Sequence, residues 1–244
     1  MKINFLGTNG WYSTPTGDTS CILIETKEEY IFLDAGEGFY KADKYVKDER
    51  PVYLFLSHLH FDHIYGLHIL PRMDFVKDLK IFVPDSKKID LEKILGSPYT
   101  ATFPGQIVPI IEGSGKEASF AWECQKMIHQ DDSYGFRLKI DGKTIVYTAD
   151  TAFCQAAIEL SKNCDMLIHE CTNKPNHKDG GWGHSNPQEA AEVAVKASAG
   201  KLILTHFMPD FYPDQKSRQV AEIEAKKIFK NTQMAFDGLE IETR

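Results

Sequence analysis

The sequence predicts an α+β protein in which two β-sheets pack back to back with helices outside. Three observations support this prediction. In each half of the chain, strand-like apolar runs come first and helical patterns follow them. Two of these runs, Tyr30–Leu33 and Thr144–Tyr147, each follow a polar turn and lead to an aspartate, Asp34 and Asp150. No low-complexity segment or long linker interrupts the chain, so we expect a single domain over residues 1–244.

The expected strands are short apolar runs rich in β-branched and aromatic residues. They are Lys2–Leu6, Ser20–Glu25, Tyr30–Leu33, Val52–Leu56, Lys80–Val83, Phe136–Ile140, Thr144–Tyr147, Met166–His169, Lys201–Leu204 and Leu239–Thr243.

The strongest helix signal begins at Asn186, which is a good N-cap and is followed by Pro187 at the first helical position and Glu189 at the third. We expect this helix to run to Ser198 and to stop at Gly200.

Three further helices are expected. Asp214 should cap one that continues to about Lys230, with an apolar face. The residues of that face are Val220, Ile223 and Ile228. The other two helices are Asp85–Leu95 and Thr151–Ser161.

Composition and net charge limit the kinds of molecule that the protein is expected to bind. The chain has 244 residues, of which 42% are hydrophobic and 26% charged, which is typical of a soluble globular protein. No apolar stretch reaches the roughly 18 residues that a membrane span needs, and Met1–Gly7 resembles a strand rather than a signal peptide. We therefore expect a cytoplasmic protein that does not bind membranes. The net charge of −7 and the lack of a Lys/Arg run disfavour long nucleic acid and favour a small substrate.

The most informative segment is His58-Leu59-His60-Phe61-Asp62-His63, which directly follows the apolar run Val52–Leu56. Three imidazoles and a carboxylate lie within six positions, at the carboxyl end of an expected strand, where α/β sheets place their sites. Imidazole nitrogen and carboxylate oxygen are ligands of Zn²⁺ and similar ions. Four donors this close cannot all bind one tetrahedral ion, which indicates two metals. Five scattered cysteines without a C-x-x-C pair argue against a disulfide framework and against a Cys-rich zinc site.

Three more donors follow apolar runs that resemble strands: His129, Asp150 and His206 follow Cys124–Ile128, Ile145–Thr148 and Leu202–Thr205. Taken alone, each histidine could be a hydrogen-bonded core residue. Asp150 alone could cap the helix that follows it. Beside the hexapeptide they are the donors that a second ion requires, and Asp150 could bridge the two ions.

The chain resembles the metallo-β-lactamase superfamily, and within it the ribonuclease Z-like group of phosphodiesterases. The similar motifs are Leu6-Gly7-Thr8, Asp34–Gly38, His58–His63, His129–Leu138, Tyr147–Thr151, Leu167–Thr172, Gly183–Ser185 and Leu204–Phe207. The H-x-H-x-D-H signature marks the superfamily, and the pair His169-Glu170 and His184-Ser185 marks the group.

This resemblance implies a four-layer αββα sandwich with two divalent metal ions at one edge of the sheets. It implies Zn²⁺ as the metal, with Mn²⁺ as the alternative. The first ion would be held by His58, His60 and His129. The second would be held by Asp62, His63 and His206, with Asp150 bridging.

The implied chemistry is attack on phosphorus by a hydroxide held between the two ions. Asp62 could orient or deprotonate that nucleophile. His184 is the candidate general acid, and Glu170 would hold its ring and favour the charged form. Without the resemblance, we would interpret His184 as a histidine of a Gly-rich surface loop. Asp34 could accept the N–H of a ligating histidine or form a turn. We expect His68, His169 and His177 to be structural.

The sequence departs from the tRNA-processing members of the group, which often carry a long tRNA-binding arm between the motifs of His129 and Asp150. Here a short hairpin fills that interval. We therefore expect a phosphodiesterase for small or cyclic nucleotides or short RNA ends. One alternative is a hydrolase of lactone, thioester or β-lactam substrates, which would not need His184 and Glu170. Another is a non-hydrolytic di-iron or regulatory metal-binding protein, although di-iron relatives usually carry Glu where His60 stands. Members of the group are often dimers, so the resemblance implies a homodimer. No exposed apolar stripe in the sequence predicts a dimer interface.

Overall fold

The computed structural model describes residues 1–243, which form two compact units. The first unit comprises Met1–Ser13, Gly17–Ile111 and the described residues from Asp237 on, and the second comprises Thr14–Thr16 and Glu112–Phe236. Each unit holds one seven-stranded mixed sheet.

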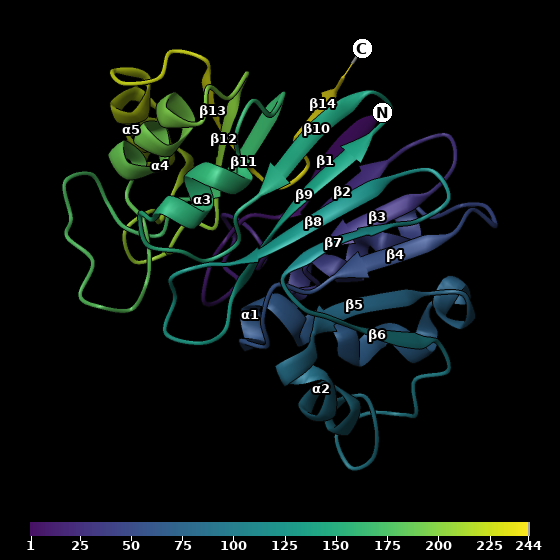
Figure 1. The fold of residues 1–244 in the computed structure, drawn as a ribbon. Helices are drawn as coiled ribbons and strands as arrows, with labels where there is room; N and C mark the ends of the chain where they lie inside the picture. The colour runs from purple at the N-terminus through teal and green to yellow at the C-terminus, as the bar shows by residue number, and fades with distance from the viewer. Residues whose placement is uncertain (244) are drawn as a thin grey trace. The chain divides into compact units, whose positions relative to one another are not determined.

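The sheet of the first unit has the order β14-β1-β2-β3-β4-β5-β6 (Figure 1). Its strands are β1 (Lys2–Gly7), β2 (Cys21–Glu25), β3 (Tyr30–Leu33), β4 (Val52–Phe55), β5 (Lys80–Pro84), β6 (Gln106–Ile110) and β14 (Glu240–Glu242). Strands β3 to β6 are parallel, and β14, β1, β2 and β3 pair antiparallel. The chain ends of β1, β3 and β4 therefore meet at one edge of the sheet.

Short helices cover one face of this sheet. The α-helices are α1 (Phe61–Ile64) and α2 (Lys88–Ile94), and 3₁₀ helices span Glu37–Lys44, Tyr65–Arg72, Asp74–Lys77 and Asp85–Lys87. Side chains of the sheet and of these helices form a continuous apolar core that includes Leu23, Phe32, Leu54, Ile64 and Leu67. Burial of Ile64 and Leu67 fixes the helical segment that follows β4. It thereby also fixes the ligand loop, which comprises the predicted donors His58–His63.

The sheet of the second unit has the order β13-β12-β11-β10-β9-β8-β7. Its strands are β7 (Gly113–Lys116), β8 (Ala121–Lys126), β9 (Tyr134–Ile140), β10 (Lys143–Tyr147), β11 (Met166–Glu170), β12 (Leu202–Thr205) and β13 (Thr232–Met234). Strands β10 to β13 are parallel, and β8 runs in their direction because β9 pairs antiparallel with both β8 and β10. The chain ends of β8, β10, β11 and β12 therefore share one edge.

Helices α3 (Gln155–Leu160), α4 (Pro187–Lys196) and α5 (Gln215–Lys226) pack on one face of this sheet (Figure 1). The predicted N-caps Asn186 and Asp214 are confirmed, and each forms a capping box. Small side chains such as Ala191, Ala194 and Ala221 are buried between helices and sheet, so α4 and α5 pack closely.

Three details of the predicted helices are wrong. The helix predicted from Thr151 begins at Gln155, because Cys154 is its N-cap. The helix predicted to stop at Gly200 ends at Lys196, and Ser198 already has a left-handed φ of 54°. The apolar face predicted for α5 is exposed.

On α5, Val220 is 50% and Ile223 57% exposed, whereas Arg218, Ala221 and Ala225 are buried. Close approach to α4 leaves room for alanine and not for branched side chains. Ile228, predicted on the same face, lies beyond the end of the helix and is 39% exposed.

Strands β6, β7, β8 and β13 were not predicted as such. Three of them, β6, β7 and β13, are edge strands, which lack the apolar alternation of strands between two neighbours. Strand β8 ends at Lys126. Residues 127 and 128, the end of the apolar run that precedes His129, therefore lie outside the strand.

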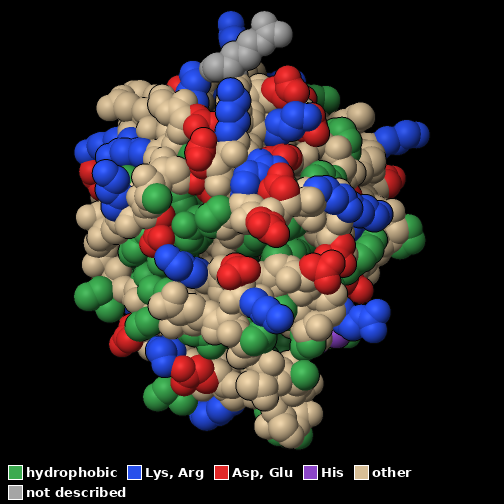
Figure 2. Space-filling view, turned by 90° about the vertical axis from the view of Figure 1, so that its right-hand side faces the viewer, with side chains coloured by type: hydrophobic (Ala, Val, Ile, Leu, Met, Phe, Trp, Pro, Cys, Tyr) green, Lys and Arg blue, Asp and Glu red, His purple; other side chains and the backbone are tan. Residues whose placement is uncertain are grey.

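The exposed surface carries both signs of charge. On the face that Figure 2 displays, Lys and Arg side chains are interspersed with Asp and Glu rather than gathered into one basic patch. Among the described residues, no helix is long and apolar enough to cross a bilayer.

Candidate metal centre

In the first unit, Asp34 organises the ligand loop. It follows β3, adopts a left-handed φ of 58° and is fully buried. Its carboxylate accepts hydrogen bonds from the Ser57 amide at 2.7 Å, the Ser57 hydroxyl at 2.9 Å and His63 Nδ1 at 2.7 Å. These bonds connect the ends of β3 and β4 to α1, and Asp34 contacts His63, one of the predicted metal ligands.

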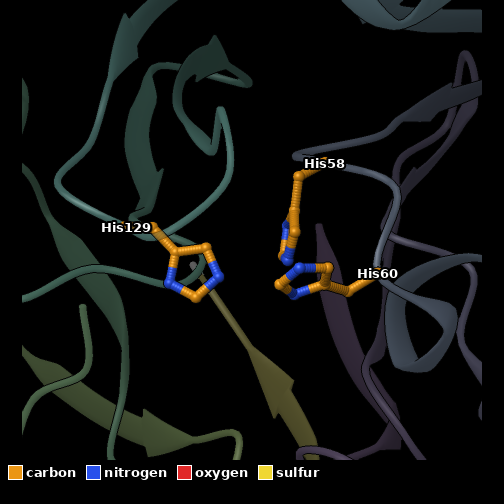
Figure 3. A group of neighbouring side chains, drawn as sticks. All are labelled: His58, His60 and His129. Atoms are coloured by element: carbon orange, nitrogen blue, oxygen red, sulfur yellow. The ribbon is translucent and has the colours of Figure 1, made fainter. Parts of the chain in front are cut away.

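The same bonds define which nitrogen of each ring holds the proton. His63 Nδ1 faces a carboxylate and must donate, so the lone pair of His63 is on Nε2. The Ser57 hydroxyl donates to Asp34 and therefore accepts from His58 Nδ1 at 3.0 Å, which also leaves the His58 lone pair on Nε2. The rings of His58 and His60 lie 4.6 Å apart, and those of His58 and His63 lie 4.2 Å apart. Figure 3 shows His58 and His60 on the loop after β4.

Asp62, on the first turn of α1, is held from a different direction. Its Oδ2 accepts the backbone N–H of Trp11 at 2.6 Å and lies 3.7 Å from His63 Nε2. Trp11 has a left-handed φ of 67°, a conformation that costs a tryptophan free energy. The loop after β1 thus turns sharply where it meets the carboxylate.

In the second unit, donors stand at the shared edge of the sheet. Asp150 follows β10, Glu170 ends β11, His206 follows β12, and His129 follows β8 (Figure 3 shows the His129 ring). Asp150 and Glu170 are buried, and so is His206. The ligand atoms of His129, Asp150 and His184 lie within 4.8 Å of one another, and so do those of Glu170, His184 and His206.

The tautomers in this unit follow the same rule as in the first. His129 Nδ1 donates to the Gly183 carbonyl at 3.2 Å. The Thr172 hydroxyl donates to the His206 carbonyl at 3.2 Å and therefore accepts from His206 Nδ1 at 2.9 Å. Both rings keep their lone pair on Nε2, the arrangement found in metal-ligating histidines.

A direct test of metal fit is the distance of 3.3 Å between His206 Nε2 and Asp150 Oδ1. Two atoms that both present lone pairs repel each other in a buried site unless a cation or proton lies between them. Tetrahedral ligands about 2.0–2.1 Å from a zinc ion stand about 3.3 Å apart. The donor set of this unit therefore suits a divalent metal ion.

The predicted contact between Glu170 and His184 is also present. His184 Nδ1 donates to Glu170 Oε1 at 2.8 Å, and Glu170 accepts two further bonds from the amides of Thr151 and Thr172. Burial disfavours the charged imidazole, but the attraction and hydrogen bond of Glu170 outweigh it and raise the pKa of His184 to about 9. Burial likewise opposes ionisation of Glu170, yet the charge of His184 lowers the pKa of Glu170.

Reasoning from the sequence missed Ser57, Thr172 and Gly183, which orient His58, His206 and His129. Gly183 has a φ of 90°, and a Cβ there would lie 2.4 Å from the His129 Cα. His169, which precedes Glu170 in the chain, was predicted to be structural. It is buried, its Nδ1 donates to the Glu170 carbonyl at 2.8 Å, and burial lowers its pKa.

Comparison with known proteins identifies the family. Residues 29–207 match the model of the beta-lactamase superfamily domain. The chain belongs to the beta-lactamase superfamily. The predicted fold class, α+β with the metallo-β-lactamase fold, is confirmed, and with it the resemblance to the ribonuclease Z-like group.

Two relatives of this superfamily member cover nearly the whole chain. The probable metallo-hydrolase YhfI of Bacillus subtilis is 30% identical over 244 residues, covering 94% of each chain. The ribonuclease Z of Microcystis aeruginosa is 27% identical over 317 residues, covering 99% of this chain and 96% of its own. The crystal structure of B. subtilis YhfI has a TM-score of 0.85 at 27% identity and covers 99% of this chain and 98% of its own.

The short form of human tRNase Z shares the fold, with a TM-score of 0.77 at 23% identity, over 99% of each chain. The relatives of this superfamily member are ribonucleases and metallo-hydrolases, and its His and Asp donors suit divalent metal ions. The protein is a metal-dependent hydrolase.

Proposed function

We propose that the protein is a dinuclear metal-dependent phosphodiesterase. One ion would be held by His58, His60 and His129. The other would be held by Asp62, His63 and His206, and Asp150 would bridge the two. Zn²⁺ suits this set of imidazoles and carboxylates, and Mn²⁺ is the second choice. The orientation of four of the histidines through Nδ1 supports these assignments.

The observation that carries the phosphodiesterase assignment is the hydrogen bond of 2.8 Å between His184 and Glu170. The His184 ring lies beside the buried donors Asp150 and His206 of the same unit, and the neighbouring carboxylate of Glu170 favours its protonated form. Cleavage of a phosphodiester expels an alkoxide, which needs a proton. The pair is also what the resemblance assigns to the phosphodiesterase group, and the alternative, a lactone, thioester or β-lactam hydrolase, is not expected to carry it.

We assign separate roles in phosphodiester hydrolysis to the residues of the site. Bound divalent ions would lower the pKa of water and neutralise phosphoryl oxygens. His184 would donate its Nε2 proton to the leaving oxygen, while Glu170 keeps the ring oriented and charged. Asp62, held by the Trp11 amide at 2.6 Å, would orient the attacking water or accept its proton.

The substrate we propose is a small or cyclic nucleotide or a short RNA end. Between His129 and Asp150 the chain contains only a short loop and the β9–β10 hairpin. The alignment with the Microcystis ribonuclease Z runs over 317 positions, whereas this chain has 244 residues. The relative therefore holds residues with no counterpart here. Its name indicates RNA as its substrate, and the missing residues favour a smaller one for this protein.

The first test is hydrolysis of bis(p-nitrophenyl) phosphate. We expect activity that chelator abolishes and that Zn²⁺ or Mn²⁺ restores. Absence of turnover with every metal tried would contradict the proposal. Iron in the purified protein would instead favour the di-iron alternative, which the hydrolase relatives disfavour.

The second test separates the two hydrolase assignments. His184→Ala should lower kcat on a dinucleotide, whose leaving group is an alkoxide, by about 10²–10⁴-fold. It should have much less effect on bis(p-nitrophenyl) phosphate, because p-nitrophenolate leaves without protonation. Equal and small effects on both substrates would contradict the general-acid role of His184, on which the preference for a phosphodiesterase over the lactone, thioester or β-lactam alternative depends.

The homodimer implied by the resemblance stays a prediction. Size-exclusion chromatography with light scattering measures it directly, and a mass near 27.7 kDa would contradict it.

A further inference from the structure

An open cavity of about 440 Å³ lies beside the ligand loop in the first unit. Its floor includes Ile64 and Leu67, which are 2% and 1% exposed and belong to the apolar core. Its walls include the rings of Phe61, Tyr65 and Tyr99. A buried floor and three aromatic walls form an apolar site whose volume lies in the usual range for small ligands.

The three rings contribute little to the core. Phe61 is 76%, Tyr65 53% and Tyr99 72% exposed. Phe61 and Tyr65 are four positions apart on successive helical turns, so their side chains lie on the same side. Aromatic rings exposed to water forgo the free energy of burial. A ligand that covered them would recover it.

The cavity adjoins the proposed metal ligands. Phe61 stands between His60 and Asp62 in the chain. A second cavity, of about 180 Å³, is lined by Asp62 together with Trp11 and Tyr12, and Phe61 and Tyr65 line both cavities. These two rings therefore form a shared wall, and a molecule held at Asp62 can reach across it into the larger cavity.

Polar groups lie along the rim of the larger cavity. His68 Nδ1 donates to the Tyr65 carbonyl at 2.6 Å, which leaves the His68 lone pair on Nε2 as an acceptor. Lys93 Nζ and Asp90 Oδ1 form an exposed pair at 2.9 Å that offers both a donor and an acceptor. Aromatic walls with donors and acceptors at one side match a planar heterocycle with a polar edge better than an alkyl chain.

We propose that this cavity binds the nucleobase of the phosphodiester substrate by stacking on Tyr99, Phe61 and Tyr65. The inference rests on the proposed function and adds to it a binding site for the base of the substrate. Stacking on aromatic side chains tolerates every base. We therefore expect weak discrimination among the bases and a strong preference for phosphodiesters that carry a base over those that carry none.

The test compares two esters with the same leaving group, thymidine 5′-(p-nitrophenyl) phosphate and ethyl p-nitrophenyl phosphate. We expect kcat/KM of the wild-type protein to favour the thymidine ester by about 10-fold or more. Tyr99→Ala should bring this ratio close to one, and Tyr99→Phe should restore it because the ring is retained. The matched control is Ile89→Ala, on the same helix as Lys93, 66% exposed and outside the cavity lining. It should keep the wild-type ratio.

A binding experiment makes the inference independent of turnover. Calorimetric titration of the zinc-loaded protein with thymidine 5′-monophosphate should give a Kd that Tyr99→Ala raises about 10-fold. Equal kcat/KM for the two esters, or a ratio or Kd that Tyr99→Ala does not change, would overturn the base site and leave the phosphodiesterase standing. Failure to hydrolyse either ester would overturn the phosphodiesterase, and the titration would still decide the base site.

Discussion

Replacing Asp34 by Asn tests the hydrogen bonds that orient the histidines. The Ser57 amide can only donate, so the oxygen of the introduced amide must take the place of Oδ1, 2.7 Å from that nitrogen. The NH₂ group then faces His63 Nδ1, where the carboxylate oxygen accepted a bond of 2.7 Å. Two donors cannot face each other in a buried site, so the His63 proton moves to Nε2. The lone pair that would bind the metal is lost.

The size of the effect follows from this change of tautomer. Loss of an outer partner of a metal-ligating histidine typically costs about 10–100-fold in metal affinity, or about 1.4–2.8 kcal/mol. The bond from the Ser57 amide becomes neutral, and the two bonds at the Oδ2 position must reverse direction, because an NH₂ group only donates. This change should lower the free energy of unfolding by about 1–3 kcal/mol. The side chain keeps its size, so we expect Asp34→Asn to fold.

The assay is competition for Zn²⁺ between the protein and a chromophoric chelator, with ¹⁵N NMR of the histidine rings to report the tautomer of His63. The matched control is Glu29→Gln. Glu29 is 2% exposed and accepts a hydrogen bond from Thr26 at 2.7 Å, at the opposite end of β3 from Asp34. Its substitution removes one buried charge and should leave the affinity for Zn²⁺ unchanged. If Asp34→Asn bound both of its Zn²⁺ ions with wild-type affinity, the role assigned to Asp34 would be refuted.

Three further predictions test other parts of the structure. Glu170→Gln removes the charge that raises the pKa of His184 to about 9, and burial then lowers this pKa, so the alkaline limb of kcat on a dinucleotide should move to lower pH. An unmoved limb would exclude His184 as the acid. Gly183→Ala places a Cβ 2.4 Å from the His129 Cα at a φ of 90°, so it should destabilise the protein by about 1–3 kcal/mol in a denaturant titration and weaken Zn²⁺ binding. Gly180→Ala in the same loop, with no atom nearer than 3.6 Å, is its control and should do neither. If residues 1–244 are one domain, calorimetry should show a single unfolding transition with equal calorimetric and van't Hoff enthalpies, and two transitions would contradict this.

Several features could be predicted from the sequence because they depend on short-range interactions. The N-caps Asn186 and Asp214 bond to backbone groups three residues away, so their residue types are sufficient to identify them. The donors of the candidate site follow buried strands, and parallel strands bring their chain ends to one edge. Asp150 and His206 could therefore be placed together within the second unit before its structure was known.

Other features depend on contacts between distant positions. Gly183 accepts from His129 across 54 residues, and Thr172 orients His206 across 34. Any carbonyl or hydroxyl could do the same, so residue type alone does not select these partners. The buried face of α5 was mispredicted for a related reason, because close approach to α4 favours Ala221 and Ala225 over Val220 and Ile223.

The sequence by itself determined the kinds of donor, their positions after buried strands and the superfamily, because strand burial and ligand chemistry are properties of residue type and order. Only the tertiary structure decided which nitrogen of each histidine bears the lone pair and which aromatic rings remain exposed beside the ligand loop. Those properties depend on distances of about 3 Å between groups that lie far apart in the chain.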